Sequence, residues 1–312
     1  MNDAFSEIFG VPEAAEPFLS LMVPEPFRRL IASLGASFTE ADAAGFLRVP
    51  QEEAGRVLEE GYHLSILDRD PERPDLFRAG SFYDRLGVFC QYEPEKWYSV
   101  PRVFRDQINR WYMDEYIRRN QPLFENGTRK DLALPLEETL AFIDRLDGPF
   151  TVRPCDCRNI FDNCRHMRET CIGIGPAGVN SSADRGQARE ITKEEAKELV
   201  RACDKDGLMH TVDASGHAIC NCCGDCCFEY RSALETGKIG PGPGSYITTL
   251  YIAEWDRTRC VNCGLCAKRC HLAAFTKLDG EVAFHPERCA GCGICSTACP
   301  KKAIVMKRRD EE

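Results

Sequence analysis

The chain has 312 residues, of which 43% are hydrophobic and 29% are charged, and its formal net charge is −9. This composition is typical of a globular protein and argues against a disordered chain. The sequence contains no stretch of about 18 apolar residues of the kind that spans a membrane and no basic-then-apolar leader segment, so we expect a cytoplasmic protein. The length fits two or three domains.

Residues 1–130 predict a helical, acidic domain that includes a small hairpin. A helix is expected from Phe27 to Leu34, a second helix is capped by Thr39, and a third follows Pro50. Residues 66–77 predict a strand, a charged turn and a returning strand. Three helices followed by a hairpin resemble a winged helix, the architecture of many DNA-binding regulators.

The charge of this region argues against DNA as its ligand. Residues 1–100 contain 18 Asp and Glu against nine Lys and Arg. The third helix would be the recognition helix, and it carries Arg56 against four glutamates: Glu52, Glu53, Glu59 and Glu60. Because Lys and Arg supply most of the non-specific affinity for DNA, we expect no nucleic-acid binding and a protein-docking role instead.

Aromatic side chains concentrate between residues 89 and 124: Phe89, Tyr92, Trp97, Tyr98, Phe104, Trp111, Tyr112, Tyr116 and Phe124. The stretch around Trp111 predicts one amphipathic helix, and aromatic residues at helical spacing usually face a core. We therefore expect packing residues here; a platform for a partner or a flavin is the alternative. Cys90 stands alone and is expected to be a buried, apolar thiol.

Residues 131–245 predict a small α/β domain that brings two cysteine-rich loops together. Helices are expected at 137–146 and from Lys193, where Thr192 and Glu195 form a capping box, and short strands at 150–152 and 209–212. Nine cysteines of this region fall in two patches: Cys155, Cys157, Cys164, Cys171, Cys220, Cys222, Cys223, Cys226 and Cys227. They exceed the needs of one tetrahedral zinc ion, so we expect at least one further iron–sulfur cluster, with zinc as the alternative. The adjacent pairs, 222–223 and 226–227, should point to opposite sides of their turn.

Two other patterns in this region carry less weight. The segment from Gly173 to Gly178 matches a dinucleotide-binding fingerprint, but Pro176 and a polar loop follow where a helix is required. The histidines show no metal-type spacing among themselves, so we expect surface or loop positions for them, His210 included. His166 lies in a cysteine loop and is a candidate ligand or proton donor. Gly240 to Gly244 reads as a linker before the last domain.

Residues 246–312 contain the most specific pattern. Cys260, Cys263, Cys266 and Cys270 are followed by the same spacing in Cys289, Cys292, Cys295 and Cys299, with Pro300 after the last cysteine. This spacing is that of the bacterial run that holds cubane clusters, in which the fourth cysteine ligates the other cluster. We therefore assign one [4Fe–4S] cluster to Cys260, Cys263, Cys266 and Cys299, and the second to Cys289, Cys292, Cys295 and Cys270. Paired zinc sites are the alternative, and they usually have a longer gap between two knuckles.

The two runs are offset by 29 residues, and Asp279-Gly280 between them predicts a hairpin over Thr276 to Phe284. Residues from about 247 to 307 resemble a two-cluster bacterial ferredoxin, although His271 stands where proline usually follows the first run. Residues from about 130 to 305 resemble a set of longer ferredoxin-like proteins, mostly of anaerobic bacteria and archaea. These carry a Pro-Cys-x-Cys-Arg element, here Pro154 to Arg158, and an Asn-Cys-Cys element, here Asn221 to Cys223.

The expected fold class is α+β, with a winged-helix-like N-terminal domain, a cysteine-rich α/β middle domain and a ferredoxin-like C-terminal domain. The resemblances imply an iron–sulfur electron-transfer protein or subunit that serves a redox partner, a flavoenzyme or a larger oxidoreductase. We therefore expect an electron-transfer component of an oxidoreductase system, and not a self-contained enzyme. Two alternatives are a reductase with an open-site cluster in the middle domain and a redox-sensing winged-helix regulator.

Overall fold

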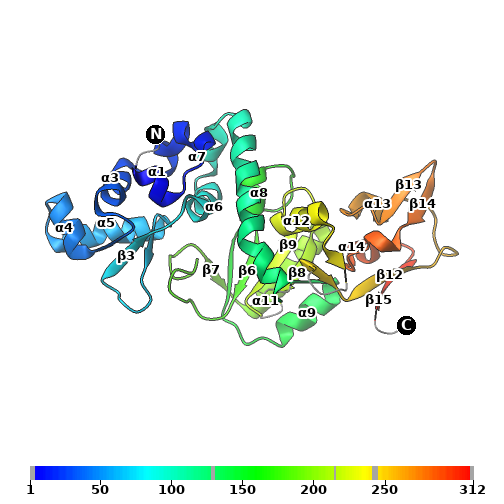
Figure 1. The fold of residues 1–312 in the computed structure, drawn as a ribbon. Coiled ribbons are helices and arrows are strands. Elements are labelled where there is room, and N and C mark those ends of the chain that lie inside the picture. The colour runs from blue at the N-terminus through cyan, green and yellow to red at the C-terminus, as the bar shows by residue number, and fades with distance from the viewer. Residues whose placement is uncertain (1–3, 128–130, 214–215, 241–244, 310–312) are drawn as a thin grey trace. The chain divides into compact units, whose positions relative to one another are not determined.

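The computed structural model describes residues 4–127, 131–213, 216–240 and 245–309. These residues divide into two compact units. The first comprises Met1–Glu115, Asn159–Phe161 and Ala177–Arg189, and the second comprises Tyr116–Arg158, Asp162–Pro176 and Glu190–Glu312. Helices and strands both occur in each unit, and the mixed content fits the expected α+β class (Figure 1).

The first unit opens with α1 (Ala4–Phe9), the 3-10 helix η1 (Glu13–Phe18) and α2 (Leu19–Met22). There follow α3 (Glu25–Leu34), β1 (Ser37–Thr39), α4 (Glu40–Leu47), α5 (Gln51–His63), β2 (Leu67–Arg69) and β3 (Leu76–Ala79). The three strands form one antiparallel sheet in the order β1-β3-β2. The predicted helices and hairpin are thus present, and Thr39 caps α4 in a capping box with Asp42.

The aromatic stretch forms α6 (Phe82–Tyr92), α7 (Pro94–Ser99) and the long α8 (Arg102–Glu125), which contributes residues to both units. Phe89, Trp97, Tyr112 and Phe124 are all at most 3% exposed. The interpretation of these aromatics as packing residues is therefore confirmed for these four. Cys90 is also fully buried, as expected.

The loop at 177–189 belongs to the first unit and is anchored there by polar contacts. The side chain of Arg185 donates to the carbonyl oxygens of Tyr62 and Leu67, the latter at 2.8 Å. Asn180 exchanges two hydrogen bonds with the backbone of Arg69, at 2.8 and 2.9 Å. The glycine-rich segment that precedes this loop therefore runs from β6 (Glu169–Ile174) into turns and β7 (Arg189–Ile191), without the helix that a dinucleotide site needs.

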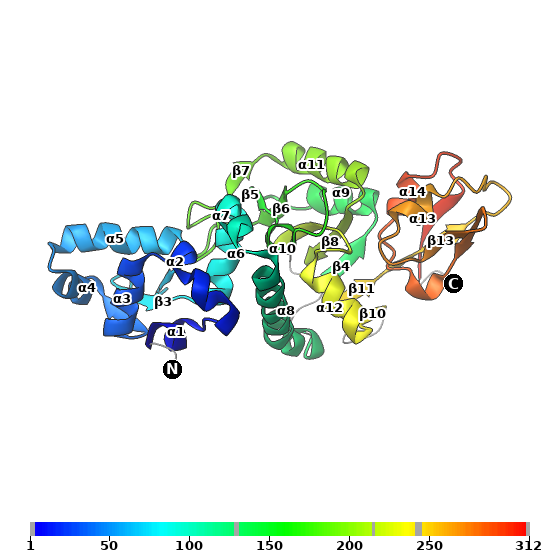
Figure 2. The ribbon, with the colours of Figure 1, turned by 90° about the horizontal axis from the view of Figure 1, so that it is seen from above.

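The second unit is built on an eight-stranded mixed sheet in the order β10-β11-β4-β8-β9-β6-β5-β7 (Figure 2). Its further strands are β4 (Asp131–Leu134), β5 (Phe150–Pro154), β8 (Met209–Asp213), β9 (Ala218–Cys222), β10 (Ile239–Gly240) and β11 (Ile247–Thr249). This sheet is larger than the small α/β domain that we expected. Cys171 on β6 and Cys220 on β9 also lie in strands, although the sequence suggested loops.

The two faces of the sheet carry different cores. On one face, α9 (Leu136–Asp144) and α11 (Lys193–Asp206) pack on residues such as Phe150, Val212 and Ile219. On the other face, Met209 packs with α12 (Phe228–Thr236) and with residues of the C-terminal region. This second face matters for function, because Cys220, Cys222 and Cys227 belong to it.

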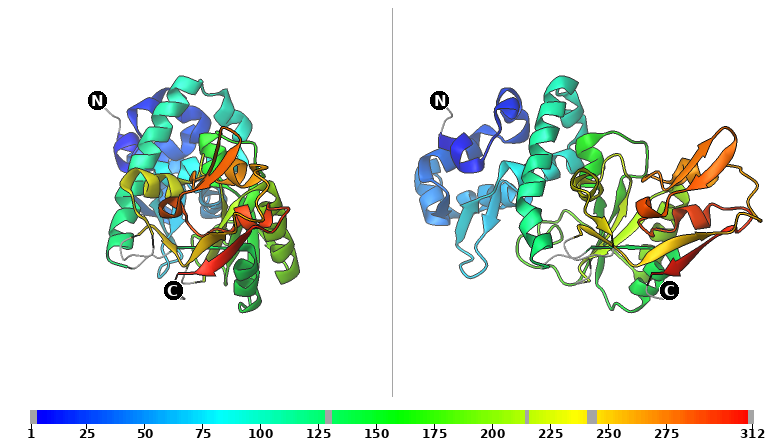
Figure 3. Two further views of the ribbon diagram at one scale, coloured as in Figure 1. Left: turned by 90° about the vertical axis from the view of Figure 1, so that its right-hand side faces the viewer. Right: turned by 45° about the vertical axis from the view of Figure 1, so that its right-hand side comes forward.

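The C-terminal region has the duplicated form that the sequence predicts. Figure 3 shows this region in the colours from yellow to red. It comprises β12 (Tyr251–Trp255), α13 (Leu265–Arg269), β13 (Phe275–Leu278), β14 (Glu281–Phe284), the 3-10 helix η2 (Pro286–Arg288), α14 (Ile294–Thr297) and β15 (Ile304–Arg308). The hairpin around Asp279-Gly280 is confirmed by the pairing of β13 with β14. Residues with a positive φ angle also recur at an offset of 29 residues. The three pairs are Asn262 with Gly291, Gly264 with Gly293, and Ala273 with Lys302.

Residues 241–244 of the expected linker lie outside the described residues, and the strands on either side of them, β10 and β11, both join the large sheet. None of the described helices is long and apolar enough to cross a membrane.

Candidate iron–sulfur centres

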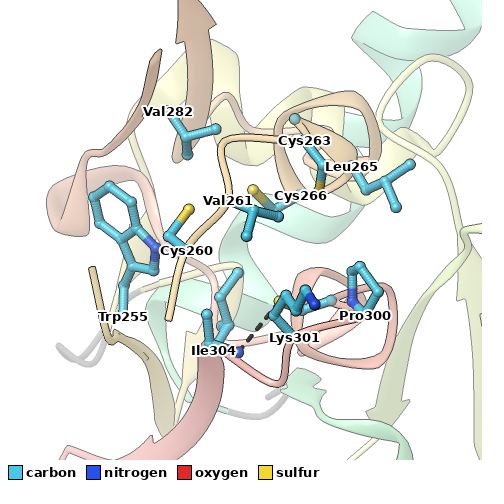
Figure 4. Close-up of a pocket in the computed structure, with 13 residues that line it drawn as sticks. Trp255, Cys260, Val261, Cys263, Leu265, Cys266, Val282, Pro300, Lys301 and Ile304 are labelled. Atoms are coloured by element: carbon cyan, nitrogen blue, oxygen red, sulfur yellow. Dashed lines mark hydrogen bonds between the residues drawn. The ribbon is translucent and has the colours of Figure 1, made fainter. Parts of the chain in front are cut away.

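The cysteines of the two ferredoxin runs line two separate pockets. The first pocket contains Cys260, Cys263, Cys266 and, from the second run, Cys299. In Figure 4 the first three of these lie on one side and Pro300, Lys301 and Ile304 on the other. Apolar side chains, among them Trp255 and Val282, close the walls.

The second pocket has the complementary set of cysteines. It is lined by Cys289, Cys292, Cys295 and, from the first run, Cys270. Both pockets have an empty volume of about 340 Å³. Each run therefore gives three cysteines to its own pocket and its fourth to the neighbouring pocket, which is the grouping that the spacing predicts.

Backbone N–H groups point at the sulfur atoms in both halves. The amide of Ala274 donates to Cys270 Sγ at 3.1 Å, and 29 residues later the amide of Ala303 donates to Cys299 Sγ at 3.3 Å. The amide of Asn262 also reaches Cys260 Sγ, at 3.5 Å. Such bonds stabilise thiolates and raise the potential of a cluster that the thiolates hold.

Burial raises the pKa of three of the ferredoxin thiols. It raises the pKa of Cys292 to about 12, raises that of Cys295 well above its ordinary value, and also raises that of Cys266. These groups are therefore protonated at neutral pH until a metal displaces their protons. Cysteine-rich pockets of this kind accept iron–sulfur clusters or zinc, both of which prefer sulfur ligands.

The nine cysteines of these two patches separate into two groups, whereas Cys203 lies buried on α11. Six of them form a closed ring of thiol–thiol hydrogen bonds, in the order Cys155, Cys157, Cys227, Cys222, Cys220, Cys171 and back to Cys155. We call this set the six-sulfur group. The remaining three, Cys164, Cys223 and Cys226, lie within 4.8 Å of one another and form the three-sulfur site.

The sheet explains how the six-sulfur group assembles. Strands β9, β6 and β5 are neighbours, and cysteines lie on or directly after each of them. Cys220 and Cys222 are two residues apart on β9, so both point to the same face of the sheet. Cys223 follows on the opposite side, and Cys227 caps α12. The adjacent pairs are therefore divided between the two groups, as expected.

Hydrogen bonds among the thiols lower the pKa of some of them and raise the pKa of their partners. Bonds from Cys171 and Cys222 lower the pKa of Cys220 to about 6. Bonds from Cys157 and Cys222 hold the pKa of Cys227 well below its usual range. In the three-sulfur site, bonds from Cys164 and Cys226 lower the pKa of Cys223. Each group thus has at least one thiolate with which to begin metal binding at neutral pH.

Arg158 is the cation of this region, and it is only 1% exposed. Its guanidinium donates to the carbonyl oxygen of Asn221 at 2.8 Å and to Thr170 Oγ1. Burial opposes its charge, but Cys155, Cys171, Cys222 and Cys223 together raise its pKa above the ordinary value. The sequence marked Arg158 only as part of a motif, and its role as a counter-charge for thiolates becomes visible only in the structure.

Two more buried polar residues near the cysteines were not predicted from the sequence. The Nδ1 atom of His210 lies 2.7 Å from the side-chain oxygen of Asn221, and burial lowers the pKa of this histidine to about 4. The expectation of a surface or loop histidine was therefore wrong for His210. Tyr230 is fully buried, and its pKa is raised by burial and by the charges of Cys292 and Cys222. No sequence spacing indicates either contact.

Comparison with known families agrees with this geometry. Residues 282–305 match the 4Fe-4S binding domain family. The matched segment contains Cys289, Cys292, Cys295 and Cys299. No curated protein and no solved structure matches the chain. The family match and the clustered cysteines support a ferredoxin-like, iron–sulfur-binding domain in this chain and an electron-transfer role for it.

Proposed function

We propose that this protein passes single electrons between a partner redox enzyme and a series of iron–sulfur clusters within its second unit. The observation that carries the proposal is the exchange of Cys270 and Cys299 between the two ferredoxin pockets. This exchange is characteristic of a pair of cubanes held by one duplicated domain. Cluster I would be held by Cys260, Cys263, Cys266 and Cys299, and cluster II by Cys289, Cys292, Cys295 and Cys270.

Cluster I is the exposed end of this series. Cys263 is exposed, and Val261 and Leu265 beside it are 56% and 43% exposed. Lys301, which lines the same pocket, is exposed as well. Electrons exchange fastest where a cluster lies close to the surface, so we place the contact with the partner enzyme here. An apolar patch with a charged rim is the usual composition of such a contact.

Cluster II is the inner member, and it adjoins the middle region. Ala290, Ile294 and Cys292 pack in the same core as Cys222 and Cys227 of the six-sulfur group. The hydroxyl of Tyr230 is close enough to Cys292 and to Cys222 to sense the charge of both. We propose that the six-sulfur group holds the further cluster, which would take electrons from cluster II through this core.

The N-terminal elements support a docking role. The order of α3, α4, α5 and the sheet β1-β3-β2 supports the proposal of a winged-helix-like domain. On α5 the side chains of Glu52, Glu53 and Glu60 are exposed, and the exposed Arg56 is paired with Glu52. This acidic helix would repel phosphate groups, so a basic protein surface is the better partner.

Cysteine variants test the cluster assignment. Cys299→Ser is expected to alter the EPR signal of cluster I, although Cys299 belongs to the second run. Cys270→Ser is expected to alter that of cluster II, although Cys270 belongs to the first run. Cys90→Ala serves as the control, because Cys90 lies in the first unit, outside both pockets. If Cys299→Ser altered only the cluster of Cys289, Cys292 and Cys295, the assignment would be wrong.

A further inference from the structure

The three-sulfur site differs from the ferredoxin pockets in the spacing of its sulfur atoms. Cys164 Sγ lies 3.7 Å from Cys223 Sγ and 3.6 Å from Cys226 Sγ. Three thiolates on one tetrahedral ion with metal–sulfur bonds of about 2.3 Å are about 3.8 Å apart. The observed separations therefore fit three ligands of a single metal ion.

A cubane requires a different spacing. Its thiolates bind different iron atoms at separate corners, so its ligands surround a space, which three mutually touching thiols do not. The ferredoxin cysteines have that arrangement, and within the described residues no three of them come within 4.8 Å of one another. The three-sulfur site has no comparable space between its sulfur atoms. It is therefore not the open-site cluster that a reductase would need.

The local backbone is that of a metal-binding knuckle. Cys223 and Cys226 are separated by two residues in the loop between β9 and α12, the short spacing typical of zinc sites. Cys164 comes from the loop after α10 (Asp156–Phe161), and Asn163 joins the two loops by donating to the carbonyl oxygen of Asp225 at 3.3 Å. Backbone N–H groups of His166 and Cys226 donate to Cys164 and Cys223 respectively, which stabilises both thiolates.

The ligand set is incomplete in the part of the chain that the structure describes. No His, Asp or Glu there joins the three cysteines within 4.8 Å. His166 is nearby, but its Nδ1 atom is held by Asp206 at 3.1 Å. Cys164 is half-buried, whereas Cys223 and Cys226 are buried, so the side of Cys164 is the one nearest to solvent. A zinc site with three protein ligands keeps its fourth position for water or another small ligand.

We propose that Cys164, Cys223 and Cys226 bind one zinc ion with an exchangeable fourth ligand, water or a small thiol. The site is independent of the iron clusters and adds a metal without redox chemistry to the chain. Its loop also contacts the ferredoxin domain, because a Cβ atom placed on Gly224 would lie 2.8 Å from the Cβ atom of His271. The zinc ion therefore fixes the loop against which the segment after Cys270 packs.

Metal analysis of the full chain, purified without oxygen, tests this inference. The wild-type protein should contain one zinc ion per chain beside its iron, and zinc-edge X-ray absorption should show three sulfur atoms and one lighter atom. Cys226→Ser should lose the zinc and keep the iron. Its neighbour Cys227→Ser is the matched control, which should keep the zinc and lose iron from the six-sulfur group.

Three results would overturn the inference: a wild-type protein without zinc, a zinc ion with four sulfur ligands, or the loss of about four iron atoms in Cys226→Ser, which would mean a cubane at this site. The absorption measurement needs no variant and stays informative if a variant fails to fold. The proposed electron-transfer function fails separately, since it depends on iron at the ferredoxin cysteines.

Discussion

The Nε2 atom of His271 donates a hydrogen bond of 2.8 Å to the carbonyl oxygen of Gly207, at the end of α11. Arg269 donates to the carbonyl oxygen of Lys205 at 2.5 Å, and Thr297 donates to the side chain of Asp204 at 3.2 Å. The last turn of a helix has unpaired carbonyl groups that favour such donors. The residue that replaces a ferredoxin-type proline thus joins the cluster domain to the middle domain.

His271→Ala is expected to lower the free energy of unfolding by about 1 kcal/mol, the usual contribution of one hydrogen bond. The measurement is chemical unfolding of the loaded protein without oxygen. His217→Ala is the control, because the side chain of His217 is 77% exposed and should contribute little. Equal losses in both variants would contradict a role for His271 in joining the domains.

Gly291→Ala is expected to prevent loading of cluster II. Gly291 has a φ of +72°, and a Cβ atom there would lie 2.3 Å from the carbonyl oxygen of Tyr251, so the loop that carries Cys289 and Cys292 would have to move. The iron content should fall by about four atoms per chain. Gly280→Ala has a similar φ, +86°, but nothing within 4 Å of the added Cβ, so it should keep its iron. A Gly291→Ala protein with full iron content would refute this account of the loop.

Arg158→Gln is expected to make the middle cluster harder to reduce. The buried guanidinium lies among the thiolates of the six-sulfur group, and a nearby positive charge favours the reduced, more negative cluster. We expect a shift on the order of −60 mV, which is about tenfold in the equilibrium constant of a one-electron couple.

A redox titration followed by EPR measures this shift, and the potentials of clusters I and II should change much less. Arg165→Gln is the control, because the side chain of Arg165 is 91% exposed and its charge is screened by water. A similar shift in both variants would mean that Arg158 has no special influence on the cluster.

Replacing Glu52, Glu53 and Glu60 by Gln should slow electron exchange with a basic c-type cytochrome, used as the acceptor. The effect should be several-fold at low salt and should vanish at high salt, because steering by exposed charges is screened. The same substitution at three exposed glutamates of the second unit, Glu194 and Glu198 on α11 and Glu235 on α12, provides a control with matched charge. Rates that do not change at low salt would contradict steering by α5.

The sequence was sufficient to predict the structure where the contacts that determine it are between residues close in the chain. The helix caps at Thr39 and Thr192 and the turn at Asp279-Gly280 are set by residues within a few positions of one another, and all three were predicted. The repeated spacing also predicts the exchange of the fourth cysteine. The two pockets are lined by the same sets of cysteines, and cluster binding by these sets stays a prediction.

The middle region could not be predicted in the same way, because its sheet pairs strands that are far apart in the chain. Cys171 and Cys220 come together only because β6 lies beside β9. The division of nine cysteines into six and three depends on which face of β9 each side chain takes, and this is unknown until 218–222 is recognised as a strand. The burial of His210 and Arg158 follows from the same sheet.

The most direct test of the electron-transfer account is the content of iron and acid-labile sulfide in protein purified without oxygen. We predict about eight iron atoms per chain at the two ferredoxin clusters and about twelve in total when the six-sulfur group is loaded, with four iron atoms per cubane. Zinc in place of iron at the ferredoxin cysteines, or a colourless protein without redox activity, would contradict the account.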